Sequence, residues 1–233
     1  MSFSFKQFHI DDSHCGMKIS TDGVLLGAWA DCSDAGSVAD VGAGSGLIAV
    51  MLAQRFTIPC ITAVEIDRDA CIDASLNVSK SPWSHRINVQ CCDFNNWLPD
   101  KPVDAIVSNP PFFTEDLHSP SRSRALARHA DKGLSFNSIL SRASDILSPT
   151  GTISLILPAE LEDEVIFKAE LSHLKPYRLC HVFSRPGKKA LRFLVELGFT
   201  DKACEFTSLY IRDNDGAFSK DYIRLTRDFY LDF

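Results

Sequence analysis

Short apolar runs rich in β-branched residues alternate with helical patterns from residue 37 to the end of the chain. The apolar runs predict strands at residues 37–41, 60–65, 87–91, 103–108, 151–157, 178–183, 191–197 and 209–212. The helical patterns predict helices at residues 47–55, 67–79, 136–147, 159–174 and 219–229, the second with Asp67 as its N-cap. Such alternation predicts an α/β fold, a mostly parallel sheet with helices on both faces. The late strand pair around Pro186-Gly187 predicts an antiparallel element at one edge.

Length and composition fit one globular domain, residues 1–233, with residues 1–36 as an N-terminal extension. Of the 233 residues, 45% are hydrophobic and 23% are charged, which excludes a disordered chain. The longest apolar run, residues 47–53, is much shorter than the ~18 residues of a membrane span, and the N-terminus lacks the apolar centre of a signal peptide. We therefore expect a cytoplasmic protein without a membrane partner. No cysteine or histidine pair has zinc-ligand spacing, so we expect no metal.

A glycine-rich turn, Asp40-Val41-Gly42-Ala43-Gly44-Ser45-Gly46, connects the first predicted strand to the first helix. Three glycines in five residues allow a tight turn and let a ligand approach the backbone with no Cβ in the way. The GxGxG spacing differs from the GxGxxG of dinucleotide folds, and the turn lacks the lysine of a P-loop. Nucleoside triphosphates are therefore disfavoured, although a plain structural turn remains an alternative.

Acidic residues follow the next two predicted strands. Glu65 ends the second strand, where a carboxylate can accept from both hydroxyls of a ribose, and Asp67 follows in the same turn. Asp93 ends the third strand and can accept from an adenine amino group while Phe94 packs on the ring. The alternatives are a helix N-terminal charge for Glu65 and a loop cap for Asp93. Together these residues indicate a pocket for an adenosine beside the glycine turn.

This combination resembles the class I S-adenosylmethionine-dependent methyltransferases. The resemblance implies a Rossmann-like, seven-stranded, mostly parallel sheet with an antiparallel edge strand. It also implies S-adenosylmethionine as the cofactor, with the glycine turn under its amino-acid part. The cofactor-binding residues that it assigns in this chain are Asp40, Gly42, Gly44, Gly46, Glu65 and Asp93.

The most specific motif is Asn109-Pro110-Pro111-Phe112, at the end of the fourth predicted strand. Two prolines fix the backbone and remove two donors, so the carbonyls of the loop face outwards as acceptors. Acceptors from Asn109 Oδ1 and the Pro110 carbonyl would favour the nucleophilic geometry of an exocyclic or amide nitrogen and stabilise its developing charge. Phe112 would stack on the planar substrate and align it. The tetrapeptide resembles the [DNS]PP[YF] motif of methyltransferases that act on N6 of adenine, N4 of cytosine or the amide of glutamine, with Phe112 in place of the commoner tyrosine.

Further segments extend the resemblance to almost the whole chain. They are Phe5-Lys6-Gln7-Phe8, residues 17–29, Ser81-Pro82-Trp83 and the closing residues 222–231. With the Asn-Pro-Pro-Phe loop, they resemble the bacterial methyltransferases that modify N6 of adenosine 37 in tRNA(Val). That family implies that the N-terminal extension, residues 1–36, contributes to the cofactor pocket and that its residues Lys18, Thr21 and Asp22 close over the methionine end of the cofactor. The alternative for Thr21-Asp22 is a helix cap.

The net charge of −6 means that RNA binding must use local basic clusters. One cluster follows the catalytic loop, and a second lies in the late hairpin; either is also compatible with an ordinary solvated surface. Their positions suit phosphate contacts around an unstacked anticodon-loop base. The residues are Arg122, Arg124, Arg128, His129 and Lys132, then Arg185, Lys188, Lys189 and Arg192.

Three alternative functions remain open from the sequence. A close one is N6-adenine methylation of another RNA, such as ribosomal RNA. Glutamine-amide methylation of a release factor uses the same loop, but those enzymes usually carry a helical N-terminal domain, and only about 36 residues precede the first strand here. A catalytically silent RNA-binding module would have a degenerate glycine turn or tetrapeptide, and both are intact. We expect the enzyme to act as a monomer.

Overall fold

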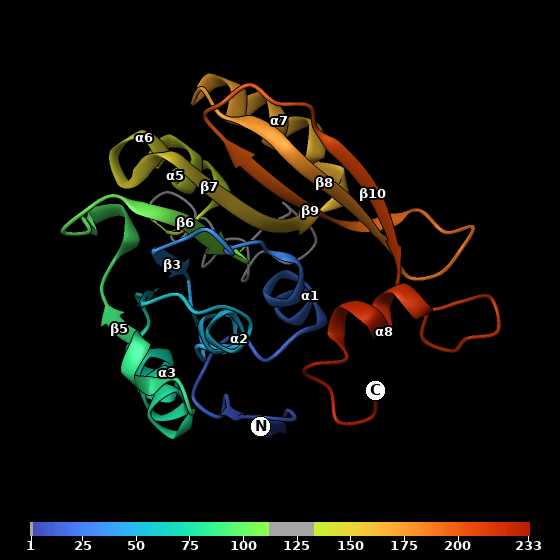
Figure 1. The fold of residues 1–233 in the computed structure, drawn as a ribbon, viewed down its shortest axis with the longest axis horizontal. Helices are drawn as coiled ribbons and strands as arrows, with labels where there is room; N and C mark the ends of the chain where they lie inside the picture. Colours follow the sequence, from blue (N-terminus) through green and yellow to red (C-terminus); the bar gives the residue numbers. More distant parts are fainter. Residues whose placement is uncertain (1, 112–132) are drawn as a thin grey trace, which may run out of the picture.

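The computed structural model describes residues 2–111 and 133–233 (Figure 1). Within these residues the large sheet has eight strands in the order β10-β8-β9-β7-β6-β3-β4-β5. The strands are β3 (Ser37–Val41), β4 (Cys60–Glu65), β5 (Ile87–Cys91), β6 (Val103–Ser108), β7 (Leu147–Pro158), β8 (Lys175–Phe183), β9 (Ala190–Gly198) and β10 (Glu205–Tyr210). All neighbours are parallel except β9, which is antiparallel to β7 and to β8. The carboxyl ends of β3, β4, β5 and β6 therefore meet at one edge of the sheet.

Helices cover both faces of this sheet, as predicted. On one face α1 (Thr21–Trp29), α2 (Leu47–Arg55) and α8 (Lys220–Thr226) share an apolar cluster with the strands. On the other face a second cluster includes α5 (Phe136–Ser141), α6 (Ala143–Ile146) and α7 (Glu162–Leu171) (Figure 1). Helix α3 (Arg68–Lys80) packs beside β4 and β5. Single 3-10 turns are η1 (Ser84–Arg86), η2 (Phe94–Asn96) and η3 (Ala159–Leu161).

Two details of the predicted sheet are wrong. The sheet has the eight strands predicted from the residues rather than the seven that the resemblance implies, and its antiparallel strand, β9, lies between β7 and β8 instead of at the edge. The burial of the strands explains this order. Residues Phe193–Gly198 of β9 are all buried, which suits an interior strand. The edge strand β10 instead leaves most of its side chains in solvent, with Phe206 70% exposed, and it pairs parallel with β8.

Element boundaries differ most outside the first four strands. The predicted strand at 209–212 is β10, which begins at Glu205. The predicted helix at 136–147 is the pair α5 and α6, and the predicted helix at 159–174 is η3 followed by α7. Helix α1 and the hairpin of β1 (Ser2–Ser4) and β2 (His9–Asp11) were not predicted. The predicted N-cap is confirmed, because the Asp67 side chain accepts from the Ala70 amide at 2.9 Å.

The N-terminal extension packs against the C-terminal end of the chain. Lys6 Nζ donates to the carbonyls of Arg227 at 2.7 Å and Phe233 at 2.6 Å, and Figure 1 shows the two termini on the same side of the fold. The rings of Phe5 and Tyr230 stack with centroids 6.1 Å apart. In the described ranges, none of the helices combines the length and the apolar character that crossing a membrane requires.

Candidate active site

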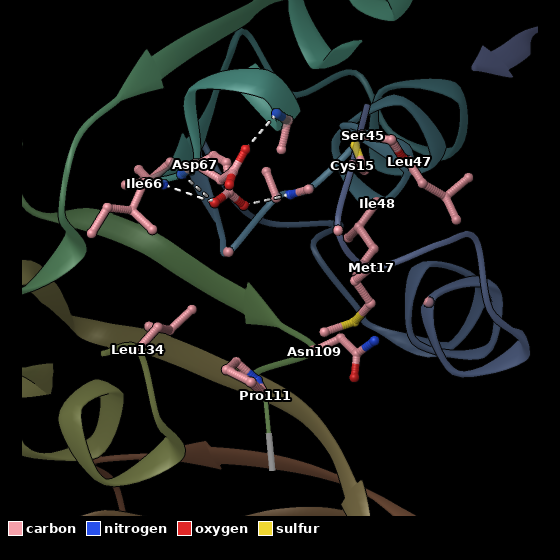
Figure 2. A pocket seen from close by; sticks show the side chains of 18 of the residues that line it. Cys15, Met17, Ser45, Leu47, Ile48, Ile66, Asp67, Asn109, Pro111 and Leu134 are labelled. Carbon is pink, nitrogen blue, oxygen red and sulfur yellow. Dashed lines mark hydrogen bonds between the residues drawn. The ribbon is translucent and has the colours of Figure 1, made fainter. Parts of the chain in front are cut away.

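A cavity of about 340 Å³ opens at the carboxyl ends of β3, β4, β5 and β6. Five segments of the described chain form its wall, and Figure 2 shows labelled side chains from each except the segment after β5. They are residues 15–20 with Gly23, residues 42–45 with Leu47 and Ile48, residues 64–67 with Ala70, residues 92–94, and Asn109 and Pro111 with residues 133–134. The volume lies within the range of about 300–1,000 Å³ for small-molecule sites.

The glycine turn presents bare backbone to this cavity. Gly42, Gly44 and Gly46 have φ values of 70°, 54° and 79°, a region that side-chain-bearing residues rarely adopt. The Gly42 amide donates to the Val64 carbonyl at 2.9 Å, which ties the turn to β4. A Cβ on Gly44 would meet nothing within 4 Å, so this position faces open space. Gly46 does not line the cavity; it packs against Ala74 of α3.

Glu65 lies between the glycine turn and the start of α3. Its Oε2 accepts from the Gly44 amide at 2.8 Å, and its Oε1 accepts from the amides of Ile66 at 2.8 Å and Asp67 at 2.9 Å (dashed in Figure 2). A carboxylate has about four acceptor positions. Three amides therefore fix the carboxylate and leave roughly one position for a ligand hydroxyl. Accepting from both hydroxyls of a ribose would require one of these amides to move.

Asp93 and Phe94 line the cavity below β5. Asp93 Oδ1 accepts from the Asn95 amide at 2.9 Å and its Oδ2 from Asn96 Nδ2 at 3.3 Å, so the residue also caps η2. The Phe94 ring is buried, and the guanidinium of Arg142 lies 5.1 Å from its centroid. Asp93 therefore caps the loop, as the alternative states, and also lines the cavity. Asp67 also lines the cavity while it caps α3.

Asp40 does not line the cavity. Its side chain is fully buried beneath the glycine turn, where Oδ2 accepts from the Ala49 amide of α2 at 2.9 Å. Its Oδ1 is also buried and has no hydrogen-bond partner among the described residues. Burial, reinforced by the nearby charge of Glu65, raises the pKa of Asp40 to about 7. This placement indicates that Asp40 supports the turn from behind rather than contacting a ligand.

The predicted N-terminal residues lie at three different places. Lys18 lines the cavity, but its ammonium donates to the carbonyls of Asp12 at 2.5 Å and Ser13 at 3.2 Å. Thr21 instead lines a second cavity of about 180 Å³. Asp22 forms an ion pair with Arg192 at 2.7 Å. The N-cap of α1 is the preceding Ser20, whose hydroxyl accepts from the Gly23 amide.

The Asn-Pro-Pro segment forms the wall opposite the glycine turn. Asn109 and Pro111 line the cavity, whereas Pro110 is buried outside its wall. Asn109 Oδ1 is buried and has no hydrogen-bond partner among residues 2–111 and 133–233. An unpaired buried carbonyl oxygen costs about 1–3 kcal/mol, so its place in a cavity wall points to a ligand that donates to it. Phe112 lies outside the described residues.

Comparison with known proteins identifies the family of this chain. Residues 23–178 match the family model described as the methyltransferase small domain. The tRNA1(Val) (adenine(37)-N6)-methyltransferase of Photobacterium profundum is 43% identical over 98% of both chains. The protein of that name from Aeromonas hydrophila is 42% identical over 98% of this chain and 97% of its own. The chain belongs to this family. The family predicted from sequence is confirmed, and the protein is an S-adenosylmethionine-dependent methyltransferase.

Solved structures confirm the methyltransferase fold. "A predicted O-methyltransferase" from Agrobacterium tumefaciens superposes with a TM-score of 0.70 at 23% identity, over 89% of this chain and 96% of the other. The ribosomal protein L11 methylase of Lactobacillus delbrueckii superposes with a TM-score of 0.58 at 15% identity, over 81% and 83% of the two chains. These similarities show that the fold of this chain, with its mostly parallel sheet, is that of the methyltransferases.

The methyltransferase cavity also contains residues that the sequence did not reveal. Cys15, Met17 and Ile19 come from the N-terminal extension, and Leu134 comes from the segment before α5. Met17 is 55% exposed and points toward Asn109 in Figure 2. The signal for Met17 and Ile19 was their place beside Lys18 in residues 17–29. Leu134 had none, because only the fold brings it to within 2.5 Å of a Cβ built on Gly42.

The two predicted RNA-binding clusters differ in what the structure describes. Arg122, Arg124, Arg128, His129 and Lys132 lie outside the described residues. Arg185, Lys188 and Lys189 are exposed in the turn that joins β8 to β9. Arg192 at the start of β9 is held by its ion pair with Asp22, next to Ser20 and Gly23 of the cavity wall. Lys189 at the end of this turn is therefore only three residues along the chain from Arg192, which contacts Asp22 of α1.

Proposed function

We propose that this enzyme transfers the methyl group of S-adenosylmethionine to the exocyclic N6 of adenosine 37 in the anticodon loop of a valine tRNA. The full-length similarity to enzymes named for that reaction supports the substrate. The observation that carries the chemistry is the unpaired Asn109 Oδ1 in the wall of the cavity. An amino group conjugated to a ring needs such an acceptor to become nucleophilic, whereas a hydroxyl or carbon substrate would need a base.

The residues present fit the cofactor. The glycine turn leaves space for the amino-acid part, because a Cβ on Gly44 would point into open cavity. Glu65 has an acceptor position for a ribose hydroxyl, and Asp93 with Phe94 suits an adenine. When bound, S-adenosylmethionine supplies a methyl group activated by a positively charged sulfur.

The chain itself has to orient the target nitrogen. Asn109 Oδ1 would accept one N–H of the adenine amino group. The predicted second acceptor is the carbonyl of Pro110, a buried residue that does not line the cavity. These acceptors stabilise the positive charge that develops on the nitrogen, a preorganised electrostatic effect. No residue with a tuned pKa is required, because the proton leaves readily once the nitrogen carries the additional bond. Phe112 remains the predicted stacking residue for the base.

We propose that the exposed lysines of the β8–β9 turn bind phosphates of the anticodon stem-loop. Lys188 and Lys189 are solvent-exposed, and the turn follows the carboxyl end of β8, the edge of the sheet that carries the cavity. The predicted contacts of Arg122, Arg124, Arg128 and Lys132 belong to the same proposal. Adenosine 37 would have to leave its stack to reach Asn109, as bases do in enzymes that modify them. A tRNA substrate also supports a cytoplasmic location.

The test is methylation of a purified valine tRNA with labelled S-adenosylmethionine, followed by mass spectrometry of the nucleosides. Wild type should form N6-methyladenosine at position 37, and a transcript with guanosine at position 37 should accept nothing. Asn109→Ala should lose about 10²–10³ in kcat while cofactor affinity stays nearly unchanged, because one preorganised acceptor is removed. The matched control is Asn88→Ala, an exposed asparagine of β5. Methylation of ribosomal RNA or of a glutamine amide instead would reject the proposed substrate.

A further inference from the structure

Residues 11–20 form a strap along one side of the cofactor cavity, which Cys15–Ser20 line. Polar contacts within the strap close it on itself. The Ile19 amide donates to Asp12 Oδ2 at 2.8 Å, and Lys18 Nζ donates to the Asp12 carbonyl at the other end of the same bend. Ser13, His14 and Gly16–Lys18 are exposed, so the strap needs outside support to keep one conformation.

The first support is Asp73 of α3. Its Oδ2 accepts from the amides of His14 at 2.8 Å and Cys15 at 3.1 Å, and its Oδ1 lies 2.7 Å from His14 Nδ1. The carboxyl side chain is only 3% exposed, whereas that of His14 is 65% exposed. All three of these contacts are made to the strap.

The second support, one turn further along α3, is Asn77. Its Oδ1 accepts from the Asp11 amide at 2.9 Å, and its Nδ2 donates to the Asp11 carbonyl at 2.7 Å. Nδ2 also donates to the Ser45 carbonyl of the glycine turn at 2.9 Å. One buried amide therefore connects the strap and the glycine turn, which are two walls of the same cavity.

The placement of these two polar residues needs an explanation beyond stability. Burying a carboxylate and an amide is unfavourable unless their hydrogen bonds are satisfied, and an apolar residue would pack a helix more simply. The partners of Asp73 and Asn77 are chiefly backbone groups of the strap and the glycine turn, together with the imidazole of His14. Both side chains therefore act on the position of the cavity walls.

We propose that Asp73 and Asn77 are positioning residues for cofactor binding, which hold the strap in register with the glycine turn. The proposal rests on the proposed function in one respect: the cavity must be where S-adenosylmethionine binds. The strap lines the cavity from the side where Met17 points toward Asn109, so its position also sets how closely the cavity fits its ligand (Figure 2).

The test compares Asp73→Asn with Asp69→Asn, an exposed carboxylate in the first turn of the same helix. The Asp73→Asn side chain keeps one acceptor oxygen and replaces the other with an amide NH2 group. That group cannot accept a hydrogen bond, so either the contacts with the His14 and Cys15 amides or the contact with the imidazole is lost. We expect the Kd for S-adenosylmethionine, measured by calorimetry, to rise about tenfold or more, since charge-assisted hydrogen bonds are lost. Hydrogen exchange of residues 12–16 should accelerate in the cofactor-free protein. The KM for tRNA should stay within about twofold, and so should every value for Asp69→Asn.

A gentler variant covers the case in which Asp73→Asn does not fold. His14→Ala removes only the exposed imidazole, so it should fold, exchange faster at residues 12–16 and bind the cofactor a few-fold more weakly. If Asp73→Asn folds, unchanged cofactor affinity and unchanged hydrogen exchange in that variant would overturn the proposal. If it does not fold, the same two results in His14→Ala would overturn it. Failure of the wild type to bind S-adenosylmethionine would instead reject the cavity as the cofactor site. An equal rise in the KM for tRNA and for cofactor would show a general loss of structure and also overturn it.

Discussion

Asp40 provides a direct test of how the glycine turn is supported. Its carboxyl group is fully buried, accepts one hydrogen bond among the described residues, from the Ala49 amide, and has a pKa of about 7 in the folded protein against 3.8 in the unfolded chain. Because the folded state binds this proton more tightly, the free energy of unfolding falls as the pH rises. The contribution is most favourable below pH 3.8, decreases between pH 3.8 and about 7, and is fully lost above that range.

The perturbation is Asp40→Asn, which removes the titration. The wild type should lose about 1.4 kcal/mol of stability per pH unit from this group, so its stability relative to the variant should fall by about 2 kcal/mol between pH 5.5 and pH 7. Asparagine can keep the acceptor for the Ala49 amide, but it places an amide NH2 group, a hydrogen-bond donor, at the site of the unpaired Oδ1. That group adds a constant penalty of about 1–3 kcal/mol, so the slope with pH is the informative quantity.

The assay is urea unfolding of both proteins at pH 5.5, 6, 7 and 8, with the exposed Asp34→Asn as a control. A difference between wild type and Asp40→Asn that is independent of pH would refute the raised pKa. Cofactor affinity gives a second readout. Since Asp40 does not line the cavity, the Kd of the variant at pH 7 should rise less than about tenfold, and a larger rise would indicate the direct contact predicted from the sequence.

Three further substitutions test other parts of the site. Glu65→Gln should weaken S-adenosylmethionine binding by about tenfold or more in calorimetry, because an amide cannot accept from Gly44 and from the next two amides together; an unchanged Kd would contradict this. Gly44→Ala should cost about 1–2 kcal/mol in unfolding experiments because of its φ of 54°, and should weaken cofactor binding further because its Cβ enters the cavity; equal affinity would place the ligand elsewhere. The pair Lys188→Ala and Lys189→Ala should raise the KM for tRNA and reduce the salt slope of tRNA binding by about 1 per lost phosphate contact, without changing cofactor affinity; an unaltered slope would exclude this turn from the RNA interface.

The sequence predicted the parallel half of the sheet well because each strand there is a short run of mainly apolar residues that ends in a turn. Strands β3, β4, β5 and β6 have the predicted bounds, and helix α2 does too. The other half depends on pairing between distant segments. The local sequence of residues 190–198 does not indicate that this strand lies between β7 and β8. Its position is determined by pairing with both of these strands and by the burial of its side chains. Helix α1 was missed because its residues from Gly23 to Trp29 are apolar and buried on all sides, so it lacks the periodicity of a surface helix.

The same division explains the site. Residues in strand-end turns, such as Glu65, Asp93 and Asn109, could be predicted because parallel strands bring their carboxyl ends together whatever the rest of the chain does. Asp73 and Asn77 could not, because in sequence they are polar residues of a helix, and such residues usually face solvent, whereas both are buried here. Their role depends on the amides of Asp11 and His14, about 60 positions away in the sequence. These amides donate to Asn77 and Asp73 only because the N-terminal strap crosses α3 in the folded chain. A motif identifies residues that touch a ligand through a local turn, whereas residues that position one cavity wall against another are visible only as hydrogen bonds between distant segments.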